Sequence, residues 1–242
     1  MRFYDALIAI LLLISFYCFA HLFYYLFAPL VRKHRFNATI KKNEMTPDKI
    51  IEKLKNDLMC HDGFAELGSL SIRFSHFADP HDATIRPELR QLVVSSTWII
   101  DFYSSKRDSI FEYKELCWTI GHELGHYHFD DYLLPAVTRK NRLIHILREV
   151  RADNYGRMLS GLSQQQVFDC LMQGLKSTRT SLTHLITVTH PTWKDRLKSL
   201  KQFPTYNADL ESQVKEDYCK KLFINQAIAD NVSLIQHDSG KQ

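Results

Sequence analysis

The order of hydrophobic and polar positions separates an apolar beginning from a mixed remainder. Residues 6–31 contain no Asp, Glu, Lys or Arg. As an α-helix this stretch would extend about 39 Å, more than the roughly 30 Å hydrocarbon core of a bilayer. A cleavable signal peptide, the alternative, has a shorter apolar region and a small-residue cleavage site before the basic run. The pattern predicts one transmembrane helix as an anchor over residues 1–31.

After the anchor, the periodicity alternates between helix and strand. Thr46 and Pro47 are typical of a helix start, and apolar residues at helical spacing continue over residues 47–60. Residues 68–75 and 91–97 alternate or are β-branched, which predicts a small sheet, with a polar loop between the two strands. From there the period is helical, and it predicts helices over residues 112–129, 139–160, 163–175, 191–202 and 208–228.

These elements indicate an α+β fold that is mainly helical. The 242 residues suffice for one good-sized domain and an appendage. A hydrophobic share of 45% with only 8 Gly and 7 Pro excludes low-complexity and mostly disordered classes. We expect a basic juxtamembrane linker over residues 32–45, one folded domain over residues 46–230 and a C-terminal tail over residues 231–242.

The charge is distributed unevenly. The net charge of +4 comes from 31 Lys and Arg against 27 Asp and Glu. Six of the basic residues but only one acidic residue fall within the first 42 positions, so the remainder carries 25 basic and 26 acidic residues. A nucleic-acid-binding face is therefore not expected, whereas a lipid bilayer is the expected partner of the first segment.

Basic residues directly after the apolar stretch predict that the domain lies on the cytoplasmic side of a single-pass membrane protein. The cysteines are widely spaced and form no CxxC pair, which is compatible with that side. Four of them could form two disulfides if the domain were exported.

The segment GHELGH at residues 121–126 places HExxH on a predicted helix. His122 and His126 are separated by about 40° around the axis and about 6 Å along it, so both imidazoles can reach one metal ion. Glu123 lies about 100° from His122 and is better placed to touch a metal-bound water. The spacing assigns different roles to the three side chains.

A second acidic motif, EVRAD, follows on the next predicted helix. Glu149 and Asp153 are four residues apart and share a face. Zinc needs a third protein ligand and leaves a fourth position open. Glu149 can supply that ligand, while Asp153 can accept a hydrogen bond from a ligand imidazole.

GHELGH, EVRAD and a later Thr189-His190-Pro191 followed by Arg196 resemble the M48 family of metallopeptidases, which includes the HtpX and Ste24 proteases. The three motifs span residues 112–201. The resemblance implies a zincin-like (gluzincin) fold, hydrolysis of peptide bonds with Glu123 as general base and acid, and one Zn²⁺ held by His122, His126 and Glu149.

The resemblance also implies that His190 and Arg196 approach the active site and that Asp153 orients a ligand histidine. A charge count agrees with this, because Zn²⁺ with ionised Glu123, Glu149 and Asp153 sums to −1, which Arg196 would neutralise. His190, as a donor, could stabilise the oxyanion that forms when water attacks the carbonyl.

Two departures separate the chain from the family. HtpX and Ste24 types have several membrane spans, so an enclosed intramembrane chamber is not implied here. The loop over residues 76–82 also lacks the NAxA sequence often found before the sheet edge in the family. Substrate identity therefore does not follow from the resemblance.

We expect a membrane-anchored zinc metalloendopeptidase that acts on peptide or protein substrates, with a role in membrane or protein quality control suggested by family analogy alone. An extended peptide is expected to pair with the edge of residues 91–97. One alternative is a catalytically silent, membrane-tethered adaptor that binds zinc and a partner peptide. Another is a regulatory protease that cleaves a single repressor. The oligomeric state does not follow from the sequence.

Two further polar clusters carry weaker alternatives. His128, Asp130 and Asp131 are most simply the polar end of the HExxH helix, with a second metal site as the alternative. The loop between the predicted strands is most simply a polar connection, although it too could bind a metal through His76, Asp79, His81 and Asp82.

Overall fold

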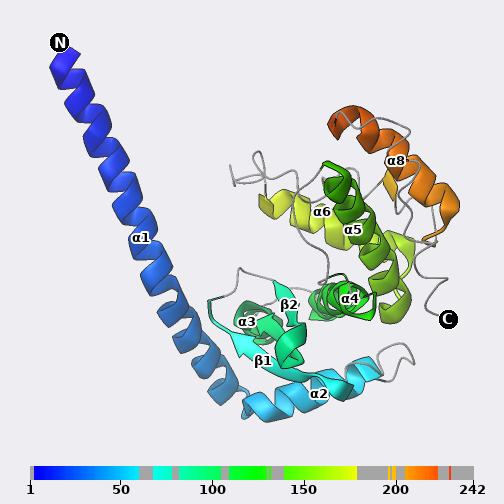
Figure 1. Ribbon diagram of the computed structural model, residues 1–242. Coiled ribbons are helices and arrows are strands. Elements are labelled where there is room, and N and C mark those ends of the chain that lie inside the picture. Colours follow the sequence, from blue (N-terminus) through cyan, green and yellow to red (C-terminus); the bar gives the residue numbers. More distant parts are fainter. Residues whose placement is uncertain are drawn as a thin grey trace.

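The computed structural model describes most of the anchor and the folded domain. The described residues are 3–59, 68–77, 82–104, 109–129, 131, 139–178, 196, 198–199, 205–222 and 229. Within these ranges the chain is mainly helical with one small sheet, which confirms the predicted α+β class (Figure 1). The elements are α1 (Phe3–Lys42), α2 (Pro47–Met59), β1 (Ser71–Ser75), β2 (Ala83–Arg86), the 3-10 helix η2 (Pro87–Leu89), β3 (Gln91–Ser95), α3 (Ser96–Ser104), α4 (Ser109–His128), α5 (Arg139–Ser160), α6 (Gln164–Thr178) and α8 (Ala208–Leu222).

Helix α1 is long and apolar enough to cross a membrane, and its apolar part projects away from the domain (Figure 1). It does not end with the apolar stretch. The predicted linker is helical as far as Lys42, and Phe36 and Ile40 are buried against Ile99 and Ile100 of α3. Position 31 therefore marks a change from apolar to basic residues within one continuous helix.

The sheet has the strand order β1-β3-β2, with β3 parallel to β1 and antiparallel to β2. The prediction that residues 91–97 form an edge is wrong, because β3 is the central strand and residues 96–97 begin α3. Leu92 and Val94 of β3 are fully buried, as expected for a strand with neighbours on both sides. The edge strands are β1 and β2, and β2 lies within the segment that was predicted to be a polar loop.

One core lies between the sheet and α4. The buried side chains that meet there are Leu54, Leu70, Ile72, Ala83, Ile85, Leu92, Val94, Trp98, Leu116, Cys117, Ile120, Leu124 and Leu159. The hydrophobic side chains of α4 therefore bury this helix independently of its histidines, as the pattern of its hydrophobic positions predicted. A second core joins α5 to α8, and a third joins Trp118 of α4 to α6.

Local capping explains where several helices begin. The hydroxyl of Thr46 accepts a hydrogen bond from the N–H of Lys49, at the start predicted for α2. Ser163 and Gln166 exchange side-chain and backbone hydrogen bonds in front of α6, which is a capping box. The predicted helices at residues 112–129, 139–160 and 163–175 are confirmed as α4, α5 and α6. The predicted helix at 208–228 is described as α8 to Leu222, and the one at 191–202 lies largely outside the described residues.

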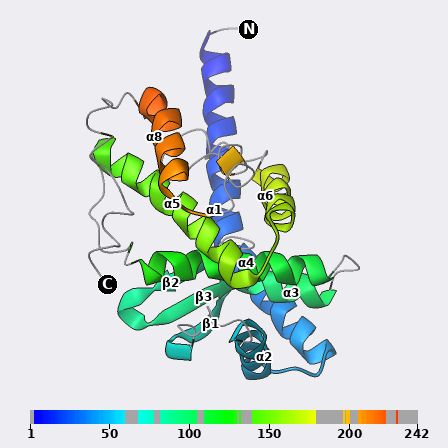
Figure 2. The same ribbon diagram turned by 90° about the vertical axis from the view of Figure 1, so that its right-hand side faces the viewer.

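Helices α4 and α5 cross with their backbones in contact (Figure 2). A Cβ atom on Gly121 would lie 2.8 Å from the Cα of Gly156, and one on Gly156 would lie 2.6 Å from the backbone nitrogen of His122. Gly125 and Ala152 continue the contact one turn along each helix. Both helices thus present small residues four positions apart, and no larger side chain fits at the crossing.

We expect Gly156→Ala to lower the free energy of unfolding by about 1–3 kcal/mol, a typical cost of overpacking. A loss of stability would be informative, because replacing Gly by Ala in an unobstructed helix raises the free energy of unfolding by about 1 kcal/mol. Thermal unfolding of the full chain in detergent would measure the change. Gly125→Ala is the comparison variant and should cost less, because its Cβ would meet Cα of Ala152 at 3.1 Å and Tyr155 at 3.2 Å, whereas a Cβ on Gly156 would meet backbone atoms, the nearest at 2.6 Å. A G156A chain as stable as the wild type would contradict the close crossing.

Candidate metal centre

Three side chains converge at the α4–α5 crossing with their ligand atoms turned toward one another. One ligand atom each from His122, His126 and Glu149 lies within 4.8 Å of the others. The two Nε2 atoms are 3.1 Å apart. The carboxylate of Glu149 is 3.5 Å from Nε2 of His122 and 3.4 Å from Nε2 of His126. This group, predicted as the ligand set, can hold a metal ion.

The sequence produces this convergence through spacing on two helices. His122 and His126 are one turn apart on α4, and Glu149 is on the facing turns of α5. The glycine contact lets the helix axes approach, so side chains of ordinary length meet between them. All three side chains are largely buried, with 11%, 12% and 5% of the side-chain surface of His122, His126 and Glu149 exposed.

Behind His122 lies the predicted partner Asp153. Nδ1 of His122 is 2.9 Å from Oδ1 of Asp153, which directs Nε2 toward the ligand group. Arg196 donates to both carboxylate oxygens of Asp153, from Nε to Oδ2 at 2.7 Å and from a terminal nitrogen to Oδ1. Trp118 covers the guanidinium, whose carbon lies 5.5 Å from the ring centre. Arg196 reaches the site as expected, but through Asp153.

A second carboxylate, that of Asp131, lies behind His126, although the sequence predicts this residue as part of the polar end of the helix. Asp131 is buried, and its Oδ2 is 2.8 Å from Nδ1 of His126. Arg148 and Arg151 of α5 both pair with Oδ1 of Asp131, at 2.9 and 2.8 Å. Each ligand histidine therefore has its own buried aspartate, and each aspartate has its own arginine partners. The expectation of a simple polar helix end for Asp131 is corrected by this contact.

These carboxylates set the charge of the imidazoles in the absence of a cation. Burial lowers the pKa of His126, but hydrogen bonds to Asp131 and Glu149 outweigh it and raise the pKa to about 10. His122 follows the same pattern with Asp153 and Glu149, and its pKa is raised. Burial raises the pKa of Asp153, but Arg196 more than reverses this and holds it below the usual value. The site is built to hold positive charge between its carboxylates.

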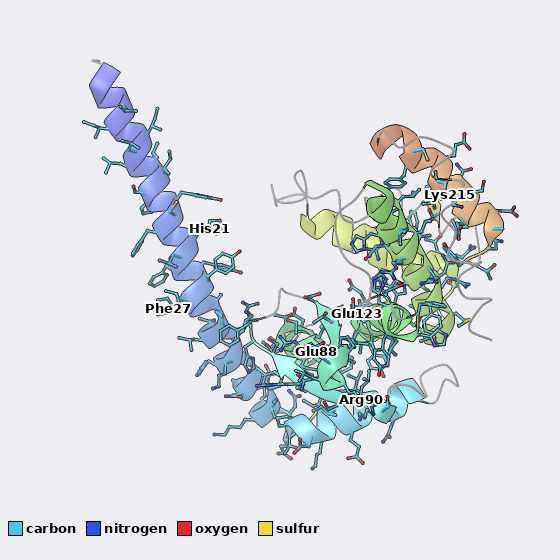
Figure 3. The ribbon with its side chains drawn as sticks, in the orientation of Figure 1. His21, Phe27, Glu88, Arg90, Glu123 and Lys215 are labelled. Carbon is cyan, nitrogen blue, oxygen red and sulfur yellow. The ribbon has the colours of Figure 1, made fainter. Side chains whose placement is uncertain are left out.

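The side chain of Glu123 extends from α4 toward the edge strand β2 (Figure 3). Its Oε2 accepts a hydrogen bond from the N–H of Ile85 in β2, at 3.3 Å. The side chain is half-buried. It belongs to the same helix turn as His122 but does not join the ligand group, which agrees with the separate role that its spacing predicted.

The remaining predicted residues divide into described and undescribed ones. His190, Asp79, His81 and Asp130 lie outside the described residues. Nδ1 of His76 is 2.9 Å from the hydroxyl of Ser96, so this histidine serves the junction of β1 and α3. Among the described residues, the His122, His126 and Glu149 group is the one with metal-ligand geometry. The four described cysteines, Cys18, Cys117, Cys170 and Cys219, form no disulfide with one another.

Comparison with models of known protein families, with curated proteins and with solved structures finds no significant match. The functional assignment therefore depends on the geometry of the site and on the chemistry of its residues.

We expect Asp131→Asn to weaken metal binding by about 10- to 100-fold, the usual effect of losing a carboxylate behind a ligand histidine. The substitution keeps the shape but removes the charge that Arg148, Arg151 and His126 share. Competition between the protein and a chelating indicator for Zn²⁺ and Co²⁺ would measure the affinity. Asp217→Asn is the control, because Asp217 pairs with exposed Lys198 on the surface. Equal affinities for D131N and wild type would remove Asp131 from this role.

Proposed function

We propose that the chain is a membrane-anchored, zinc-dependent metalloendopeptidase of the M48 type. The observation that carries the proposal is the convergence of His122, His126 and Glu149, with Glu123 on the same helix turn and outside the ligand group. Two imidazoles and one carboxylate are a ligand set of catalytic zinc sites, which keep a position open for water or substrate. The donor set therefore fits Zn²⁺.

Zinc held at such a site lowers the pKa of a water molecule and polarises a carbonyl group. The residues of the chain then have separate tasks. Glu123 accepts the proton of the attacking water and passes it to the leaving amine. Asp153 and Asp131 hold His122 and His126 in the tautomer that directs Nε2 toward the ligand group. No covalent intermediate with the enzyme is expected.

The edge strand β2 is the best surface for an extended peptide. It pairs with β3 on one side, and its N–H at Ile85 is directed to Glu123 rather than to β3. A peptide that adds to this edge by main-chain pairing would pass beside Glu123. We therefore propose that an extended peptide pairs with Ala83–Arg86, and not with residues 91–97 as the sequence predicted.

The adaptor alternative needs the metal ligands but no general base. Glu123 is an ionisable group beside the ligand set and is held in place by the backbone of β2. A buried or half-buried carboxylate costs free energy, and a module that only binds a peptide gains nothing from it. This favours the enzyme, with His190 as the proposed oxyanion donor.

We further propose that α1 crosses the membrane once and that the domain lies in the cytoplasm. The length and hydropathy of α1 support a membrane span, and the basic residues that follow Val31 support the orientation.

We expect Glu123→Gln to retain one zinc ion per chain and to lose about 10²- to 10⁴-fold in turnover, the usual contribution of a general base. Zinc content and cleavage of casein would be measured on the same preparations of the full chain. Glu149→Gln is the matched control, because it removes a ligand and should lower zinc content and cleavage together.

Proteolysis by E123Q at the wild-type rate would exclude the assigned role of Glu123. Stoichiometric zinc in the wild type without cleavage of any unfolded substrate would favour the adaptor. A wild-type chain that binds no zinc would overturn the proposed function altogether.

Orientation is tested by a cysteine at an exposed position of the domain. Lys53→Cys on α2 should be labelled by a membrane-impermeant maleimide only after the cells are permeabilised, because Lys53 would face the cytoplasm. The wild type supplies the background from native cysteines. Labelling of K53C in intact cells would reverse the proposed topology.

A further inference from the structure

The height of the domain above the bilayer is set by α1, which enters the folded core without a break. Phe36 and Ile40 are 4% and 9% exposed and pack with Ile50 of α2 and Ile99 of α3. Because a helix rises 1.5 Å per residue, Phe36 lies roughly 7–8 Å beyond Val31, the last apolar position. No flexible linker separates the anchor from the core.

Two positions of α1 at the end of its apolar stretch are shielded from solvent. Ala28 is half-buried and Pro29 is buried, whereas Leu30 and Val31 on the other faces of the helix are exposed. Part of this cover comes from α1 itself, because Nε of Arg32 donates to the carbonyl of Ala28. Phe36, less than two turns beyond Val31, already packs in the core, so the domain begins close to the surface of the leaflet.

The end of β1 is the part of the sheet that lies beside this boundary. Its arrow points toward α1 in Figure 1, and the ring of Phe36 is 5.4 Å from Phe74 and 5.3 Å from His76. Burial and then the charges of Lys33 and Arg32 lower the pKa of His76, so both cations act on the chain just after β1. The residue that follows His76 is thus placed near the headgroup level.

That residue is Phe77, whose side chain is 80% exposed. Within the described part of the chain, no other large hydrophobic side chain is more exposed, including those of the apolar anchor. Aromatic rings are favoured at membrane interfaces, and basic side chains near the surface are attracted to anionic lipids. Lys33 is exposed and Arg32 is half-buried, which leaves both within reach of headgroups.

We propose that Phe77, Arg32 and Lys33 form a bilayer contact in which the phenyl ring enters the interfacial region and the two cations bind anionic lipid headgroups. The contact rests on the proposed membrane span of α1 but not on the metal site. With α1 as one attachment and Phe77 as a second, the domain cannot rotate about the anchor. The β2 edge and the metal centre then keep one orientation relative to the membrane.

The test uses the full chain with Phe77→Trp, reconstituted in vesicles of phosphatidylcholine and phosphatidylglycerol that contain brominated acyl chains. Leu89→Trp is the matched control, because Leu89 is 58% exposed but precedes the opposite end of the sheet. Its neighbours Glu88 and Arg90 are labelled in Figure 3. Carbonate extraction of the same vesicles reports separately whether α1 is inserted.

We expect the fluorescence added by F77W to shift to shorter wavelength and to lose most of its intensity in brominated vesicles, while that added by L89W changes little. Arg32→Gln with Lys33→Gln should reduce the quenching of F77W in anionic vesicles. Carbonate-resistant chains in which F77W is unquenched, or in which F77W and L89W are quenched alike, would overturn the contact alone. Extraction of the chain by carbonate would overturn the anchor, and the contact with it.

Discussion

The close crossing of α4 and α5 is the constraint on which the rest of the structure depends. A metal-ligand set drawn from two helices requires their axes to approach until short side chains meet between them. Gly121 and Gly156 allow this because neither carries a Cβ, and any side chain there would collide with backbone atoms that cannot move aside. The position of Glu149 opposite His122 and His126 follows from that approach.

The crossing brings a second requirement, which is charge compensation. Three carboxylates, Glu149, Asp153 and Asp131, are buried beside two imidazoles, and buried charges are costly unless they are paired. Arg196 forms an ion pair with Asp153, while Arg148 and Arg151 form ion pairs with Asp131. The pair of Arg196 joins the chain after α6 to the crossing. The pairs of Asp131 join the connection between α4 and α5 to it.

The candidate ligand group could be predicted from the sequence because it depends on spacing within single helices. His122 and His126 share one face of α4, and Glu149 and Asp153 share one face of α5. These two relations hold whatever the tertiary structure. Asp131 could not be predicted in this way, because it lies beyond the end of α4, where no periodicity fixes its direction. The one available signal was the pair Arg148 and Arg151, which are three residues apart and share one face of α5.

The fold could also be predicted only where the pattern lies within a single element. Long periodic helices were correctly predicted, whereas β2 has only two inward positions, Ala83 and Ile85, which is too short for alternation to be recognised. The strand order was also beyond reach of the sequence, because β1 and β3 pair in parallel through contacts between distant segments. The small residues at the crossing did carry a signal, since Gly121 and Gly125 repeat at the same spacing as Ala152 and Gly156.

Helix α3 connects the anchor to the metal centre through packed side chains. Trp98 belongs to the core shared by the sheet and α4, while Ile99 and Ile100 belong to the core that receives the end of α1. Because packed interiors are nearly incompressible, a displacement of α1 relative to the sheet would have to move α3 as well. The path from α3 leads through β3 and β2 to the hydrogen bond between Ile85 and Glu123. Helix α1 and the proposed general base therefore belong to one mechanical unit, so in the proposed membrane-anchored enzyme the orientation of α1 would set the direction from which a substrate reaches Glu123.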